Sequence, residues 1–244
     1  MMRHAVVVGA AGAIGQACSI ALQEYGWSVT SLDLRVPSQA AGQAGTMDVT
    51  NLHSVTESLQ AAEKRGPIGA LVYAAGANAS GPVDATDWER YDQLMAVNLR
   101  GAFHVGSVIL GMLRKQPREL GISFLSSTAG IVGEADGSVY CATKFGLRGF
   151  VQAFAAEIAP FGGRANSVCP GNVDSPMLRT LANQIAERSC VTEADVMAKL
   201  VGSSAFDRLL LPAEVARTCA WLVSAQASGI SGQTIVVDGP PRTN

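Results

Sequence analysis

The stretch "AVVVGAAGAIGQA", residues 5–17, runs from an apolar, β-branched segment through a glycine-rich turn into the start of a helix. Glycine permits the tight turn and leaves the backbone bare. Free N–H groups and the helix macrodipole favour an anion at such a helix start. We therefore interpret the turn as the pyrophosphate site of a dinucleotide; the alternative is a loop without a ligand. The residues assigned to the site are Gly9, Gly12, Ala13, Ile14 and Gly15.

An acidic residue follows at the distance that a dinucleotide site requires. The next apolar run ends in "SLDLR", residues 31–35, which places Asp33 18 residues beyond Gly15. An acid there accepts hydrogen bonds from the adenosine ribose hydroxyls. The same carboxylate repels a 2′-phosphate, so we expect NAD rather than NADP. Arg35 is the nearby cation that would weaken this preference, and the alternative is that Asp33 is only a turn residue.

Short apolar runs alternate with stretches of helical periodicity along the chain. This alternation is typical of a parallel sheet covered on both faces. The expected fold is doubly wound α/β, a Rossmann fold, with one domain over residues 1–244. The expected strands lie at 5–8, 28–32, 70–73, 122–125, 164–168 and 233–237. The expected helices lie at 13–25, 51–65, 87–114, 139–159 and 212–224.

Residues 172–211 interrupt this alternation. Two short helical segments follow the strand expected at 164–168, in place of a single crossover helix. Insertions of this length after the carboxyl end of a strand commonly cover a binding crevice. We therefore expect residues 172–211 to form a substrate lid.

Composition excludes several functional classes. Hydrophobic residues make up 48% of the 244 residues and charged residues 16%, as in a globular chain with a large core. The net charge of −2 and the lack of Lys/Arg runs argue against nucleic acid and membrane partners. Three scattered histidines show no metal-ligand spacing. Five widely spaced cysteines without a C-x-x-C pair suit reduced thiols, so we expect a cytoplasmic protein.

A tyrosine and a lysine stand four residues apart in "SVYCATKFG", residues 138–146. On a helix they share one face, so Tyr140 and Lys144 address one point in space. A tyrosine is a poor acid or base at neutral pH unless a neighbouring ammonium stabilises its phenolate, and Lys144 is placed to do so. Ser127, 13 residues upstream of Tyr140, follows an expected strand, so its hydroxyl converges with the phenol.

Asn98 stands among apolar residues in "AVNLRG", residues 96–101, inside an expected helix. Unpaired amide groups in a core are costly. We therefore expect Asn98 to hold a water molecule or to kink its helix.

These residues together resemble the short-chain dehydrogenase/reductase superfamily over essentially the whole chain. The resemblance implies that Tyr140 is the general acid/base and that Ser127 hydrogen-bonds the substrate oxygen. Lys144 would hold the nicotinamide ribose and lower the pKa of Tyr140, and Asn98 would anchor a proton-relaying water. The matching elements, in the order of the family, are "GAAGAIG" (9–15), Asp33, "DV" (48–49), "AAG" (74–76), Asn98, "SS" (126–127), "YCATK" (140–144), "PGNVDSP" (170–176) and "GQTIVVDG" (232–239).

The resemblance also implies where the rest of the cofactor lies. Asp48 and Val49 would flank the adenine, and Pro170, Gly171 and Val173 the nicotinamide. Further cofactor contacts are implied at Ala75, Gly76 and Ser175.

The chain departs from the family pattern in two places. The family usually has glycine where this chain has Ala13, and this chain has glycine one position earlier, at Gly12. We expect the pyrophosphate turn to sit slightly differently. Where the family commonly reads Asn-Asn-Ala-Gly, this chain reads "YAAG" from Tyr73 to Gly76. The lost asparagine usually ties the central strands together, so its absence bears on stability more than on chemistry.

The implied reaction is the reversible, NAD-dependent oxidation of a secondary alcohol to a ketone. Hydride goes to the nicotinamide while Tyr140 takes the hydroxyl proton and Ser127 polarises the same oxygen. The alternative is a catalytically silent protein that senses NAD.

The substrate stays open at this stage. Residues 170–197 resemble the lid of hydroxybutyrate dehydrogenases, but the histidine and lysine that hold the carboxylate there are replaced by Ala129 and Gly137. A short hydroxy acid held in that manner is therefore disfavoured. Sugar-derived alcohols, sugar acids held by another cation such as Arg179, and cyclic alcohols remain. Glu134 and Asp136 either bond a polyol or are simply solvated.

We also expect a homo-oligomer, a tetramer. Related enzymes pair through the helices that carry Asn98 and Tyr140, and here residues 87–114 and 139–159 are apolar on more than one face. An exposed patch of that size is a liability for a monomer.

Overall fold

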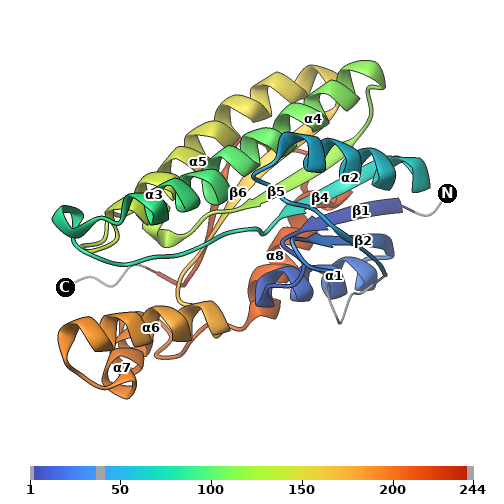
Figure 1. The fold of residues 1–244 in the computed structure, drawn as a ribbon. Coiled ribbons are helices and arrows are strands. Elements are labelled where there is room, and N and C mark those ends of the chain that lie inside the picture. Colours follow the sequence, from blue (N-terminus) through green and yellow to red (C-terminus); the bar gives the residue numbers. More distant parts are fainter. Residues whose placement is uncertain (1–2, 37–41, 241–244) are drawn as a thin grey trace.

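The computed structural model describes residues 3–36 and 42–240. Seven strands form one parallel sheet in the order β3-β2-β1-β4-β5-β6-β7, so the chain reverses its direction of winding between β1 and β4 (Figure 1). This arrangement confirms the predicted doubly wound α/β fold. The strands are β1 (Arg3–Val8), β2 (Trp27–Asp33), β3 (Gln43–Thr46), β4 (Ile68–Tyr73), β5 (Leu120–Leu125), β6 (Gly163–Pro170) and β7 (Thr234–Val237).

Helices cover both faces of the sheet, which explains why the strands read as continuous apolar runs. Along β1, Val7 packs on one face, whereas Val6 and Val8 pack on the other, and all three are fully buried. The predicted helices at 13–25, 51–65, 139–159 and 212–224 are confirmed to within one residue at each end. One face carries α1 (Ala13–Glu24) and α8 (Pro212–Val223); the other carries α2 (Leu52–Arg65), α4 (Gly101–Lys115) and α5 (Ser138–Ile158).

The helix predicted at 87–114 is continuous in direction but not in geometry. It begins as α3 (Trp88–Leu94), widens into a π-helical segment at Met95–Arg100, and continues as α4. Its length and apolar composition would suffice to cross a membrane. In this fold the inner side chains of α4, such as Ile109 and Leu113, are instead fully buried in the core beside the sheet.

Strand β3 is an addition that the sequence analysis missed. Its residues, "QAGT", lack the β-branched run that marks the other strands. The pairing with β2, from Thr30 beside Gln43 to Asp33 beside Thr46, holds it at the edge of the sheet. A Cβ on Gly45 would lie 3.1 Å from the Leu32 side chain, so the small residue lets Leu32 pack. Tertiary pairing, rather than local propensity, makes this strand.

Between β6 and β7 the chain leaves the sheet to form α6 (Pro176–Ser189) and α7 (Glu193–Ser203), which project beside it (Figure 1). These helices pack on each other through their own small apolar cluster, centred on Ala182, Ala186 and Val196. The chain leaves and returns at one place: Leu210 N–H donates to Asn172 C=O at 2.8 Å, and Asp174 N–H donates to Leu210 C=O at 2.9 Å.

Candidate functional site

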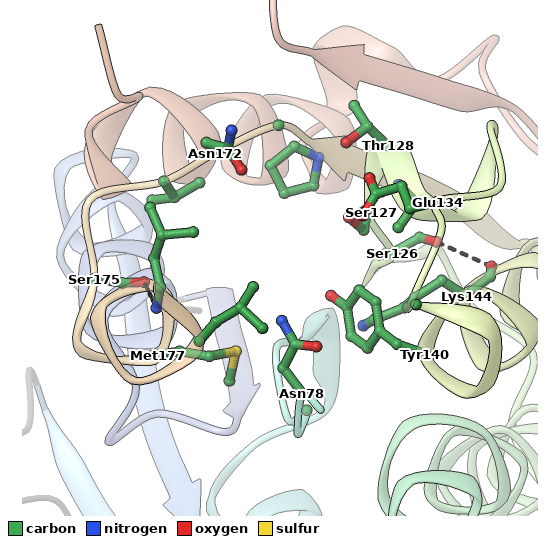
Figure 2. A pocket seen from close by; sticks show the side chains of 18 of the residues that line it. Asn78, Ser126, Ser127, Thr128, Glu134, Tyr140, Lys144, Asn172, Ser175 and Met177 are labelled. Carbon is green, nitrogen blue, oxygen red and sulfur yellow. Dashed lines mark hydrogen bonds between the residues drawn. The ribbon is translucent and has the colours of Figure 1, made fainter. Parts of the chain in front are cut away.

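A pocket of about 250 Å³ opens at the carboxyl ends of β4, β5 and β6. The chain reverses its winding nearby, which is where doubly wound folds bind ligands. Figure 2 shows Ser127, Tyr140 and Lys144 on one side of the pocket, and Ser175 and Met177 at the start of α6 on the other. The pocket therefore lies between the sheet and helix α6 of the segment predicted to be a lid.

The three residues predicted to carry the chemistry lie together. Ser127 follows β5 and caps a short 3₁₀ turn, since its Oγ accepts a hydrogen bond from Ala129 N–H at 3.2 Å. Tyr140 lies in the first turn of α5, and its side chain lines the same side of the pocket as Ser127 (Figure 2). Lys144 follows one turn later, and its Nζ lies 5.5 Å from the centre of the Tyr140 ring. The same Nζ donates to Leu125 C=O at 2.9 Å, which fixes the ammonium beneath the ring.

Burial dominates the electrostatics of this group. It raises the pKa of Tyr140 to about 12, and the neighbouring Ser127 hydroxyl only partly opposes this rise. Burial also lowers the pKa of Lys144 to about 8. In the protein without a bound cofactor the pKa of Tyr140 therefore lies above its ordinary value, because the desolvated phenolate is costly; that Lys144 stabilises the phenolate stays a prediction.

Asn98 lies in the π-helical segment and is fully buried. Its Oδ1 accepts from Ala77 N–H at 2.7 Å, and its Nδ2 donates to Ala77 C=O at 2.9 Å and to Thr143 Oγ1 at 3.1 Å. The predicted distortion of the helix is confirmed, and the amide is satisfied by protein groups. Asn98 thus ties the loop after β4 to α5, one residue before Lys144, while its part in a water relay stays a prediction.

The glycine-rich turn is closely packed at Gly9 and Gly15. Gly9 has φ of +83°, and a Cβ there would lie 2.3 Å from Ala75 N. A Cβ on Gly15 would lie 2.1 Å from Gly9 C=O. Neither position accepts a side chain without moving backbone. Gly12 differs, because its φ is −73° and its nearest neighbour would be 3.5 Å away.

The start of α1 fits an anion. Its first residue is Ala13, preceded by Gly12, which has no side chain to cap the free N–H groups of the first turn. Several other helices begin with a capping side chain, namely Asn51 for α2, Asp87 for α3, Ser175 for α6 and Thr192 for α7. The uncapped helix start, with the pocket beside it at Ile14, therefore suits the pyrophosphate of a dinucleotide.

Asp33 ends β2 next to this turn. Its Oδ2 accepts a hydrogen bond from Ala11 N–H at 2.9 Å, so the carboxylate also holds the turn in place. Asp48 is similarly engaged, since its Oδ1 accepts from Thr50 N–H at 2.9 Å and from Thr50 Oγ1 at 2.7 Å. The Val49 side chain is buried in the core. Other predicted cofactor residues that line the pocket are Ile14, Ala75, Gly76, Pro170, Gly171, Val173 and Ser175.

Comparison with known proteins agrees with this geometry. Residues 9–239 match the family model described as enoyl-(acyl carrier protein) reductase. The chain belongs to the short-chain dehydrogenase/reductase superfamily. Members of this superfamily are oxidoreductases that use a nicotinamide cofactor.

Relatives in the superfamily cover nearly the whole chain. A putative ketoacyl reductase of the monensin polyketide synthase from Streptomyces virginiae is 34% identical, covering 97% of this chain and 96% of its own. An (S)-acetoin-forming diacetyl reductase from Staphylococcus aureus is 30% identical, with 80% of this chain and 76% of its own covered. The structure of actinorhodin polyketide ketoreductase with NADPH superposes with a TM-score of 0.89 at 26% identity, covering 98% of this chain and 96% of that one.

The structure explains both departures from the superfamily pattern. Gly12 serves as the N-cap, so Ala13 starts α1 without strain. Tyr73 replaces the missing asparagine with a different tie: its ring is fully buried, and its hydroxyl donates to Val97 C=O in the π-helical segment at 2.7 Å. The strand β4 is thereby joined to the segment that carries Asn98.

The sequence did not reveal the residues that hold the turn after β5 against α5. Ser126 Oγ donates to Lys144 C=O at 3.0 Å, and a Cβ on Gly130 would lie 2.7 Å from the same Oγ. The 3₁₀ turn after β5 is thus pressed against α5. The repeated serine in "SS" is the sequence signal for Ser126, but its partner is visible only in the fold.

Proposed function

We propose that the protein is an NAD-dependent oxidoreductase that interconverts a secondary alcohol and a ketone. The observation that carries the proposal is the convergence of Ser127, Tyr140 and the buried Lys144 in one pocket, beside an uncapped helix start. The names of the relatives, a ketoacyl reductase and a diacetyl reductase, support a carbonyl substrate.

Tyr140 and Ser127 act on the same substrate oxygen in this proposal. In the oxidation direction the phenolate form of Tyr140 takes the hydroxyl proton, and in reduction the phenol returns it. The Ser127 hydroxyl donates a hydrogen bond that holds the substrate oxygen at Tyr140. When bound, the nicotinamide supplies the hydride acceptor, or the donor for the reverse reaction.

Lys144 has an electrostatic part. Its ammonium beneath the ring stabilises negative charge on the phenol when that charge develops during proton transfer. The bond to Leu125 C=O keeps the ammonium in place without rearrangement. We assign Lys144 to the nicotinamide ribose as well, since its Nζ would lie 3.7 Å from a Cβ placed on Gly76, at the edge of the same pocket.

Turnover tests the catalytic assignment. NADH formation is measured with a panel of sugar alcohols, cyclic alcohols and acetoin, for the wild type, Tyr140→Phe and a control, Tyr25→Phe, whose ring is 42% exposed. We expect Tyr140→Phe to lower turnover by about a hundredfold or more while NADH binding, followed by fluorescence, is retained. Retained turnover in a folded Tyr140→Phe variant contradicts the assignment. Binding of NADH without turnover of any alcohol by the wild type favours the silent sensor.

The preference for NAD is proposed from Asp33. An ionised carboxylate forms charge-assisted hydrogen bonds with ribose hydroxyls and repels a 2′-phosphate, which together favour NAD by about a hundredfold or more. Arg35 is exposed and is the cation that would oppose this preference.

Two variants separate the charge of Asp33 from its bond to the turn. Asp33→Asn removes the charge but keeps an acceptor for Ala11 N–H, whereas Asp33→Ala removes both. Comparing kcat/KM for NAD and NADP with one alcohol, we expect both variants to lose the preference, and Asp33→Ala to bind either cofactor more weakly. A wild type that favours NADP, or an unchanged preference in Asp33→Asn, contradicts the proposal that Asp33 determines the preference for NAD.

We further propose a homotetramer in the cytoplasm. On the outer face of α4 and α5, Phe103 and Phe145 are 50% and 42% exposed, and the Phe103 ring packs on Phe150 with centroids 4.2 Å apart. Such a face suits pairing of two copies. Sedimentation tests the assembly, and a monomer at micromolar concentration would contradict it. The five cysteines, all within the described residues, are free, which suits a reducing compartment.

A further inference from the structure

The pocket is uneven in charge. Among its lining residues that the structure describes, the side chains that carry charge are one carboxylate, Glu134, and one ammonium, Lys144. Figure 2 places Glu134 beside Ser127, on the catalytic side of the pocket. The remaining lining side chains are apolar or neutral, with Asn78 and Asn172 as the amides. A substrate would therefore meet one negative group near its reacting carbon.

The ammonium does not offset this charge for a substrate. Lys144 is buried under Tyr140 and donates to Leu125 C=O. The proposed partners of the Lys144 ammonium are the cofactor ribose and the phenol of Tyr140. A carboxylate or phosphate on the substrate would therefore not find Lys144 free.

Nearby arginines are also engaged. Arg179 forms an ion pair with Asp174 at 2.8 Å. This ion pair makes Arg179 a weaker candidate for binding the carboxylate of a sugar acid. Arg188 on α6 reaches across to the loop before α5 and pairs with Asp136 at 3.1 Å. Neither arginine lines the pocket beside Tyr140. An anionic substrate group that approached either of these arginines would have to compete with its carboxylate partner.

The backbone around Glu134 is held in place. Its N–H donates to Cys141 Sγ at 3.4 Å, and its C=O accepts from Gly137 N–H at 3.1 Å, so the loop is tied to the first turn of α5 that carries Tyr140. Desolvation raises the pKa of the Glu134 carboxyl, and no hydrogen bond or ion pair within the described residues opposes that rise. The carboxylate is thus placed near the phenol with unused acceptor capacity.

We propose that Glu134 determines specificity by charge: it accepts a hydrogen bond from a substrate hydroxyl beyond the reacting carbonyl, and it disfavours substrates with a carboxylate or phosphate at that place. The inferred substrates are neutral hydroxyketones and the corresponding diols. This inference rests on the proposed ketone reduction and names its substrate class.

Three matched probes test it. Butan-2-one, 4-hydroxybutan-2-one and acetoacetate carry the same reacting ketone but end in a methyl group, a hydroxyl or a carboxylate. The quantity is kcat/KM for each ketone with NADH, for the wild type, Glu134→Gln, Glu134→Lys and a control. The control is Glu187→Gln, which removes the same charge from an exposed position on α6 outside the pocket lining.

In the wild type we expect the hydroxyketone to exceed butan-2-one, and acetoacetate to be the poorest. Glu134→Gln should raise the ratio of acetoacetate to butan-2-one by about tenfold, since it removes a repulsion between two charges in a poorly screened pocket. Glu134→Lys should raise it further and should lower the ratio of hydroxyketone to butan-2-one. Glu187→Gln should leave both ratios within about twofold, as exposed charges are screened.

Two results would overturn the proposal. If the wild type reduces these ketones and neither Glu134 variant changes the ratios beyond those of Glu187→Gln, the specificity role is refuted while the proposed function stands. If the wild type reduces none of the ketones although it binds NADH, the proposed function fails, and this inference fails with it.

Discussion

Tyr73 on β4 contacts the helix at Val97 and Gly101, and we expect substitutions on the two sides of this contact to have coupled effects on the free energy of unfolding. Tyr73→Phe removes the hydroxyl that donates to Val97 C=O at 2.7 Å. A buried hydrogen bond of this kind contributes about 1 kcal/mol to the free energy of unfolding. The ring remains, with its packing on Phe124 at 5.8 Å between centroids. We therefore expect a loss of about 1 kcal/mol from Tyr73→Phe.

Gly101→Ala perturbs the same contact from the other side. A Cβ there would lie 2.5 Å from Tyr73 Oη and 3.0 Å from the Val49 side chain. Overpacking in a core costs about 2 to 3 kcal/mol. The better helix propensity of alanine offsets about 1 kcal/mol. The net expected loss is about 1 to 2 kcal/mol, because the clash exceeds the propensity gain.

The two substitutions should not be additive. In the Tyr73→Phe background the oxygen nearest the new Cβ is gone, and the contact with Val49 remains. The double variant should therefore lose about 1 kcal/mol, which is about 1.5 kcal/mol less than the sum of the single losses.

Urea unfolding at one fixed protomer concentration measures it, since assembly would make stability concentration-dependent. Tyr25→Phe, at an exposed tyrosine, is the control and should change stability by less than about 0.5 kcal/mol. Losses that add to within about 0.5 kcal/mol would refute the reasoning, because independent sites behave in that way.

Other predictions concern the cofactor turn, the pH dependence and the lid. Gly9→Ala should abolish NADH binding measured by fluorescence, because its Cβ would lie 2.3 Å from Ala75 N at a φ of +83°; full binding would contradict the tight turn. Burial raises the pKa of Tyr140, and the charges of Glu134, Cys141 and Cys169 add to the rise. Glu134→Gln should therefore lower this pKa and move the pH profile of alcohol oxidation, which needs the phenolate, to lower pH. A shift of the profile to higher pH would contradict this prediction. Arg188→Ala, which unties α6 from the loop across the pocket, should raise KM for the ketone several-fold with kcat less affected. An unchanged KM would indicate that this contact is incidental.

The central features of the site were predictable because they are local in sequence. Ser127 follows a strand, and Tyr140 and Lys144 are one helical turn apart, so chain geometry alone brings them together. The turn from Gly9 to Gly15 is likewise a short segment between two recognisable elements. For these residues the sequence pattern predicts the local structure. The parallel sheet then places the ends of the strands at one edge, where the site lies.

Features that depend on tertiary partners were not predictable. The edge strand β3 exists because β2 offers it a register, and its own residues do not indicate a strand. The role of Tyr73 was not predictable, because it depends on Val97 and Gly101, which lie against Tyr73 only in the folded chain. The raised pKa of Tyr140 was not predictable, because spacing gives the distance along a helix but not the desolvation of the phenol. Distance, burial and competing partners are properties of the folded chain.

The hydrogen bonds at the base of the α6–α7 segment have a consequence for how such a protein diversifies. Asn172 and Asp174, where the chain departs, are hydrogen-bonded to Leu210, where it returns, so the sheet meets the same two anchor points whatever lies between them. Doubling the length of such an excursion costs only about 0.6 kcal/mol in loop entropy. Helices α6 and α7 also hold together through an apolar cluster of their own. The segment between these anchor points can therefore change in length and sequence with little effect on the sheet, at whose edge Ser127, Tyr140 and Lys144 lie.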